Sequence, residues 1–158
     1  MWETNDELFK REKGKILEEL AGVGYPVRRL ADLRDGKRYR PALEVLLRWF
    51  EHAKDDTTKW EVSEYLQVRW AKEEVVPALI REFKLVNPKS RDCGGLKWRY
   101  ADALESVAYE DCFENLVDLL ENYQVGPHDN GAARKMLCLA IGKTKHPDAA
   151  DFLLRYVD

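Results

Sequence analysis

The chain has 158 residues, of which 45% are hydrophobic and 35% are charged. This balance disfavours a disordered or an all-β chain and is typical of amphipathic helices in one domain of ordinary size. The net charge of -3 supplies no overall positive field for a phosphate backbone, which disfavours a general nucleic-acid binder.

The N-terminal segment is rich in charge and lacks the basic start and apolar run of a signal peptide. We expect residues from about 4 to 22 to form a capping helix whose polar surface closes one end of the fold. No stretch of the sequence has the length and apolar character of a membrane span. The sequence therefore predicts a cytoplasmic protein without a membrane anchor.

An internal repeat follows the capping segment, because a shift of 37 residues aligns the chain with itself. Leu79, Leu116 and Leu153 fall in one column, and the residue after each of them is also apolar. Apolar residues recur in each copy at i, i+1 and i+4, which is one face of a helix. The period therefore predicts a chain of related helical units.

Each repeat is predicted to be a helical hairpin. Short polar turns at 72–74, 109–111 and 145–148 separate its two helices, and longer connections with glycine or proline separate the repeats. A lone hairpin cannot bury its apolar face, so neighbouring hairpins must stack. We expect one domain over residues 1–158, with repeats at about 23–54, 57–86, 94–123 and 130–158.

The fourth repeat carries a family pattern. Residues 134–154 read RKMLCLAIGKTKHPDAADFLL, in which a basic residue, apolar residues leading to Gly142, and an acidic turn precede a second apolar helix. This run resembles the HEAT repeat family, and residues 97–120 resemble it with Glu105 in place of the glycine. The first two repeats depart further, with Tyr25 and Trp60 near the place of the basic residue. The resemblance implies an all-α fold, a right-handed α-α superhelix or HEAT-like solenoid, and says little about function.

One column at the repeat period is charged and alternates in sign. Glu44, Arg81, Asp118 and Arg155 follow one another at intervals of 37 residues. Packed helix axes lie roughly 8 to 10 Å apart, so opposite charges at equivalent positions of neighbouring helices can meet. The column predicts a ladder of ion pairs that fixes the rotation between repeats. The alternative is that these side chains contact a ligand.

The second helices of the repeats carry the predicted binding face, since second helices line the concave side in the family that the chain resembles. Basic residues concentrate between positions 28 and 48, whereas residues 100–133 include carboxylates but no Lys or Arg. The predicted function is a non-catalytic interaction or adaptor module for an unidentified protein or peptide. A plain solvated helix face is the alternative. The predicted contact residues are Arg40, Glu44, Arg48, Arg81, Lys84, Glu114, Asp118, Glu121, Asp151 and Arg155.

The sequence predicts no catalytic, metal or cofactor site. Its histidines lack the His-x-x-x-His and Glu-x-x-His spacings of metal ligands. Its three cysteines, Cys93, Cys112 and Cys138, fall in no metal-ligand spacing, which predicts reduced thiols. The turn at Gly94 and Gly95 lacks the pattern of a phosphate-binding loop, so no nucleotide cofactor is expected.

Two alternatives to the adaptor hypothesis stay open. Alkylpurine DNA glycosylases of the HEAT-like class hold DNA with Trp, Asp and Arg side chains, which Arg40, Arg48 and Trp49 could imitate. The lack of basic residues between 100 and 133 disfavours this DNA-binding or DNA-repair function. The other alternative is self-association through the C-terminal helix, because no later helix covers its apolar side.

Overall fold

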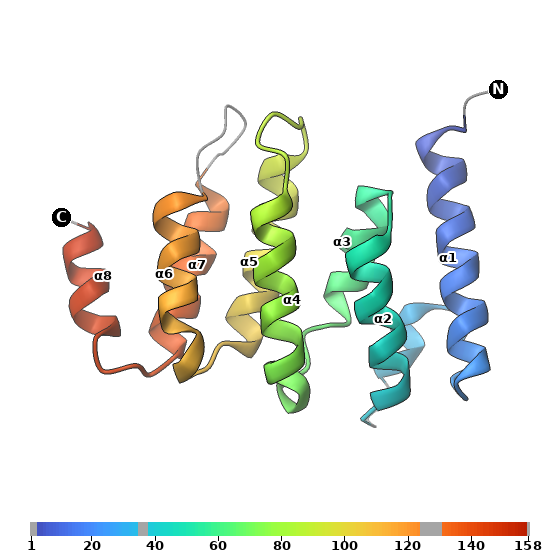
Figure 1. The fold of residues 1–158 in the computed structure, drawn as a ribbon, viewed down its shortest axis with the longest axis horizontal. Coiled ribbons are helices and arrows are strands. Elements are labelled where there is room, and N and C mark those ends of the chain that lie inside the picture. The colour runs from blue at the N-terminus through green and yellow to red at the C-terminus, as the bar shows by residue number, and fades with distance from the viewer. Residues whose placement is uncertain (1–2, 35–37, 124–130, 158) are drawn as a thin grey trace. The chain divides into compact units, whose positions relative to one another are not determined.

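The computed structural model describes residues 3–34, 38–123 and 131–157 (Figure 1). These residues form helices joined by loops and contain no strand, which confirms the all-α prediction for the described part of the chain. None of the described helices is both long enough and apolar enough to cross a membrane. The chain divides into two compact units, residues 1–66 and 67–158, and the division falls within the predicted second repeat at 57–86. The single-domain prediction stays a prediction.

The first unit begins with a helix that its own sequence caps. Thr4 precedes α1 and accepts a hydrogen bond from the Glu7 N–H through its hydroxyl, while the Glu7 carboxylate accepts one from the Thr4 N–H. Asp55 caps α3 with a single side-chain bond, because its carboxylate accepts the Thr58 N–H at 2.7 Å. The helices of this unit are α1 (Asn5–Gly22), the 3-10 segment η1 (Leu30–Arg34), α2 (Arg40–His52) and α3 (Asp56–Glu64).

The core of the first unit lies among α1, α2 and α3, which pack against one another. Leu20, Leu43, Leu46 and Phe50 are fully buried in it. The described residues of this unit include two buried carboxylates, those of Glu12 and Asp55. The Glu12 carboxylate accepts hydrogen bonds from the backbone N–H groups of residues 54 and 55, at 2.9 and 3.3 Å. Glu12 therefore joins α1 to the loop between α2 and α3.

The second unit consists of five α-helices and two short 3-10 segments among its described residues. The predicted turn at 72–74 is wrong, since these residues form the first turn of α4, where the acidic residues Glu73 and Glu74 complement the helix dipole. The predicted connection at 122–131 lies mostly outside the described residues, which leave out 124–130 and Asp158. The elements are η2 (Arg69–Ala71), α4 (Lys72–Leu85), α5 (Cys93–Val107), η3 (Glu110–Cys112), α6 (Phe113–Asn122), α7 (Ala132–Lys143) and α8 (Ala149–Val157).

The helices of the second unit form two layers. α5 packs against α7 in one layer, and α4 packs against α6 in the other, with α5 and α7 behind α4 and α6 in the view of Figure 1. α8 packs on α7 beside α6. Leu79, Leu104, Leu116 and Ile141 are fully buried between the layers. This arrangement leaves the outer sides of α4, α6 and α8 on one face of the unit.

Candidate functional site

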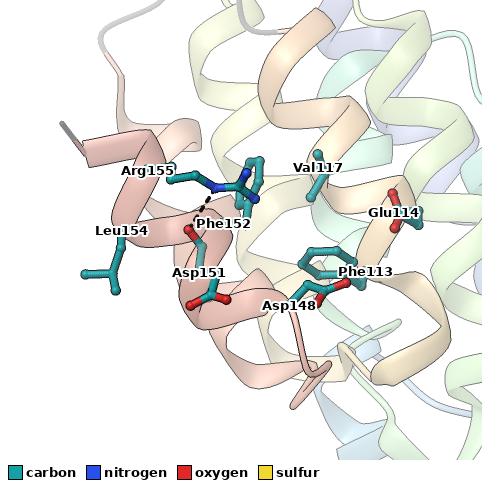
Figure 2. A pocket seen from close by; sticks show the side chains of 8 residues that line it. All are labelled: Phe113, Glu114, Val117, Asp148, Asp151, Phe152, Leu154 and Arg155. Carbon is teal, nitrogen blue, oxygen red and sulfur yellow. Dashed lines mark hydrogen bonds between the residues drawn. The ribbon is translucent and has the colours of Figure 1, made fainter.

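An open groove of about 640 Å³ lies between α6 and α8 (Figure 2). Its apolar floor starts at Phe113, the first residue of α6, which is buried. The Phe152 ring of α8 meets the Phe113 ring edge to face at 6.2 Å between centroids, and the His146 ring stacks on Phe113 at 4.2 Å. Such aromatic contacts fix the spacing of the two helices. Val117 adds an aliphatic side chain from α6.

The rim of this groove is mainly acidic. Glu114 on α6 and Asp151 on α8 are exposed, and no ion pair or hydrogen bond engages either carboxylate within the described part of the chain. Asp148 stands between the two helices, with its carboxylate 3.9 Å from Nδ1 of His146. The Arg155 Nε donates to the main-chain oxygen of Asp151 at 3.2 Å. The groove thus presents three carboxylates against one guanidinium.

A second groove, of about 420 Å³, lies on the other side of α6, against α4. Val76, Pro77 and Ile80 supply its apolar wall, and Leu85 lies at its edge with 69% of its surface exposed. Two of the predicted contact residues, Arg81 and Lys84, belong to this groove. Asp111 also lines the second groove, so the two grooves flank α6 and the second one holds two basic side chains and one carboxylate.

Asp118 of α6 binds Lys84 of α4 across the layer. The Lys84 Nζ lies 2.6 Å from Oδ2 of Asp118, the Asn122 amide donates to Oδ1 at 2.8 Å, and the ammonium also lies 4.9 Å from the centre of the Tyr123 ring. The ion-pair ladder predicted Arg81 and Arg155 as the partners of Asp118, and this prediction is wrong. The partner is Lys84, one helical turn after Arg81. Arg155 donates to the main-chain oxygen of Asp151 in its own helix. Equivalent helix positions set backbone spacing, but the reach of each side chain decides the pairing.

This ion pair shifts the pKa values of both partners. The Lys84 hydrogen bond holds the pKa of Asp118 below its ordinary 3.8, and the same bond raises the pKa of Lys84 above 10.5. The stabilisation is present above the ordinary pKa of Asp118 and is lost as the pH falls through the lowered value. At the alkaline end it is lost as the pH rises through the raised pKa of Lys84.

Replacing Asp118 with asparagine should lower the free energy of unfolding by about 0.5 to 1 kcal/mol at neutral pH. The value is small because the two side chains are 32% and 37% exposed, so solvent screens the pair. Urea denaturation of wild type and Asp118→Asn across pH would measure the effect. The difference between the two proteins should shrink at a pH well below 3.8. A difference that stays constant with pH would contradict an electrostatic origin.

The first unit has its own groove, of about 330 Å³, between α1 and α2. Arg48 and Trp49 line it, and Arg48 forms an ion pair with Glu19 of α1. The Trp49 indole N–H is buried and has no hydrogen-bond partner among the described residues. Basic residues outnumber carboxylates along this groove, whose other charged or titratable residues are Arg11, Glu12, Lys15, His52 and Lys54.

The structure places all ten predicted contact residues on α2, α4, α6 and α8. Arg40 and Glu44 are exposed on α2, and Glu121 is exposed near the end of α6. Five of the ten line the two grooves of the second unit, namely Arg81, Lys84, Glu114, Asp151 and Arg155.

The sequence did not reveal the apolar members of these grooves. Leu154 falls in the same 37-residue column as Ile80, but it is 69% exposed at the outer edge of the α6/α8 groove, whereas Ile80 is buried. Phe113 and Phe152 carry no signal that separates a groove aromatic from a core aromatic. Apolar periodicity identifies the apolar side of a helix but does not show whether another element covers that side.

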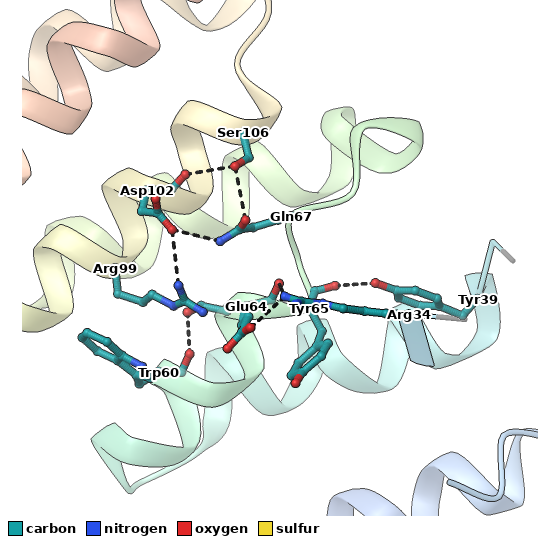
Figure 3. Close-up of polar contacts among 10 residues, drawn as sticks. Arg34, Tyr39, Trp60, Glu64, Tyr65, Gln67, Arg99, Asp102 and Ser106 are labelled. Atoms are coloured by element: carbon teal, nitrogen blue, oxygen red, sulfur yellow. Dashed lines mark hydrogen bonds and ion pairs between the residues drawn. The ribbon is translucent and has the colours of Figure 1, made fainter. Parts of the chain in front are cut away.

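Polar contacts near the start of the second unit support the fold rather than the grooves (Figure 3). The Asp102 carboxylate accepts from the Gln67 amide at 3.1 Å and from Arg99 at 3.3 Å, and the Ser106 hydroxyl donates to the Gln67 side chain at 3.2 Å. This set joins the beginning of the unit to α5. It orders a buried charge, since Arg99 is only 8% exposed.

A separate set of contacts lies in the first unit (Figure 3). Arg34 forms an ion pair with Glu64 at 2.8 Å, and its guanidinium lies 5.0 Å from the centre of the Tyr65 ring. The Tyr39 hydroxyl donates to the main-chain oxygen of Tyr65 at 2.9 Å. Burial raises the pKa of Tyr39 to about 12, so this phenol stays protonated and remains a donor.

Few groups among the described residues suit metal binding or thiol chemistry. No three His, Cys, Asp or Glu side chains lie there in positions that could hold a metal ion. Cys93, Cys112 and Cys138 are free thiols, and burial raises the pKa values of Cys112 and Cys138. A raised thiol pKa lowers the fraction of reactive thiolate.

Comparison with models of known protein families found no match for this chain, and neither curated proteins nor solved structures gave one.

Proposed function

We propose that the protein is a non-catalytic interaction or adaptor module that binds a protein or peptide partner through the outer sides of its second helices. In the second unit this surface consists of α4, α6 and α8. The observation that carries the proposal is the pair of open grooves that flank α6, each with an apolar floor and exposed charged side chains. Apolar floors with polar rims are typical of sites that bind protein segments.

The proposed architecture is a HEAT-like solenoid in a right-handed superhelix, and the proposed location is the cytoplasm. Two features support stacked hairpins. Leu79 and Leu116, one repeat apart, are both fully buried, and the small residues Ala103 and Ala140, also one repeat apart, are buried where α5 packs against α7. Small residues at equivalent positions allow helices to approach closely, as repeated units require.

The proposed function is tested by reversing exposed charge on α6. Glu114→Lys/Glu121→Lys changes two side chains that no described residue engages, so the fold should stay intact. Immobilised protein would capture partners from a lysate of the cells that make it, followed by mass spectrometry. We expect one principal partner with wild type and a loss of roughly tenfold with the variant, because reversed charges slow association and repel the partner.

A matched control separates the α6 surface from net charge. Glu18→Lys/Asp92→Lys makes the same change in charge at exposed positions that line neither groove. Capture by this control should equal that of wild type, and circular dichroism should show unchanged helicity in both variants. Equal capture by all three proteins would contradict the proposal that the partner binds the second-helix surface.

A DNA-binding function is the second candidate, favoured by the basic groove of the first unit around Trp49. Three carboxylates on α6, at Glu114, Asp118 and Glu121, oppose it, since they would repel a phosphate backbone. Fluorescence anisotropy of labelled duplex DNA at low and moderate salt distinguishes the two candidates. The adaptor proposal predicts no salt-dependent binding of duplex DNA.

A further inference from the structure

The α6/α8 groove leaves apolar surface uncovered by the described chain. Leu154 is 69% exposed at its outer edge, and Val117 and Phe152 are only partly buried. Covering large apolar side chains in an open groove with another molecule removes their surface from water, which is favourable. The groove volume of about 640 Å³ falls in the range of sites that enclose several side chains or a small ligand.

The charged residues around this apolar surface determine whether a bound segment should be positively or negatively charged. Glu114 and Asp151 stand on opposite helices, and neither carboxylate has a partner among the described residues. Arg155 extends from α8 toward α6 and donates to the Asp151 main-chain oxygen. Three carboxylates and one guanidinium give a local excess of negative charge. A cationic occupant complements this rim, and an acidic or phosphorylated one is repelled.

Building on the proposed function, we propose that the α6/α8 groove binds a short cationic amphipathic segment of a partner protein. Its apolar side chains cover Val117, Phe152 and Leu154, and its Lys or Arg side chains pair with Glu114 and Asp151. An amphipathic helix that lays its apolar face in a groove is a common mode of peptide recognition. The aromatic contact of Phe113 with Phe152 holds the two walls in place before binding.

The probe for this proposal is a labelled 14-residue peptide, LKKLLKLLKKLLKL, titrated with the full chain and followed by fluorescence anisotropy. Two matched peptides replace all Lys with Glu or all Leu with Ser. We expect saturable binding of the first peptide, roughly tenfold or more tighter than that of either control peptide, with affinity falling as salt rises. Equal binding of the Glu peptide, or no saturable binding of the first, would overturn the proposal.

Variants of the protein test whether the first peptide binds in the α6/α8 groove. Glu114→Lys/Asp151→Lys should weaken binding of the first peptide by at least about tenfold, because it removes the complementary charge. Leu154→Ser should weaken binding by about fivefold, because it removes an apolar contact. Glu18→Lys/Asp92→Lys carries the same change in charge outside the groove and should bind as wild type does. Leu154 is exposed, so its replacement leaves the core unchanged. Affinity that falls equally in the groove and control variants would overturn the site.

The failure of this inference and the failure of the proposed function give different results. Capture from lysate that depends on the α6 charges, without binding of the cationic peptide, rejects the cationic segment and keeps the adaptor function. Sedimentation that shows a dimer of wild type but a monomer of Leu154→Ser assigns the groove to a second copy and also rejects it. Peptide binding at the groove without a lysate partner supports the cationic specificity and counts against the adaptor role.

Discussion

Replacing Leu116 with alanine is expected to lower the free energy of unfolding by about 2 to 5 kcal/mol. The Leu116 side chain is fully buried in α6 between the two layers of the second unit. Its truncation removes apolar transfer free energy and leaves a cavity that packed helices fill only in part. Urea denaturation followed by circular dichroism measures the change.

The matched control for this prediction is Leu85→Ala, which removes the same atoms from a leucine with 69% of its surface exposed. Its cost should stay within about 0.5 kcal/mol, as is usual for surface substitutions. Equal costs at positions 85 and 116 would contradict the arrangement of α4, α6 and the layer behind them.

Glu12→Ala is expected to cost about 2 to 3 kcal/mol of stability in the first unit. Glu12 is only 6% exposed, and its carboxylate accepts the backbone N–H groups of Lys54 and Asp55. Hydrogen bonds to a charged acceptor stabilise more than neutral ones, and removal of this acceptor leaves the buried Asp55 N–H without a partner. The loss should appear as a lower urea midpoint.

Glu12→Gln separates the hydrogen bonds from the space that the side chain fills. Glutamine keeps one acceptor oxygen and the length of the side chain, so its cost should be less than half that of alanine. Wild-type stability in Glu12→Ala would show that the α1 contact to the loop between α2 and α3 contributes little to the fold.

The sequence predicted the all-α class because apolar spacing is a strong local signal. Leu79 and Leu116, aligned by the 37-residue shift, are both buried at the centre of the second unit. The same signal could not predict which charged residues are buried. Lys97 is buried because its ammonium donates to the Tyr123 main-chain oxygen at the end of α6 while lying 5.7 Å from the Phe83 ring centre. A long side chain reaches such a carbonyl through its apolar stem, which residue periodicity does not describe.

The candidate site was predictable in part. Charged residues on second helices identified the face that holds Arg81, Glu114 and Asp151, but not the grooves that divide it. Groove formation depends on how far α8 stands from α6, which the aromatic contacts of Phe113 and Phe152 set. These contacts join residues that are distant in sequence, and a repeat period alone does not encode them.

A partner is expected to bind the side of the second unit that carries α8 and α6 rather than the side that carries α7. Leu154 on α8 and Leu139 on α7 are both exposed leucines, at 69% and 47% of their surface, so they form a matched pair. The most direct test places the photo-crosslinker benzoylphenylalanine at each position in turn and irradiates the protein in a lysate of the cells that make it. The account predicts a discrete protein adduct from position 154 and none from position 139, whereas an adduct only from 139, or the same adducts from both, would contradict it.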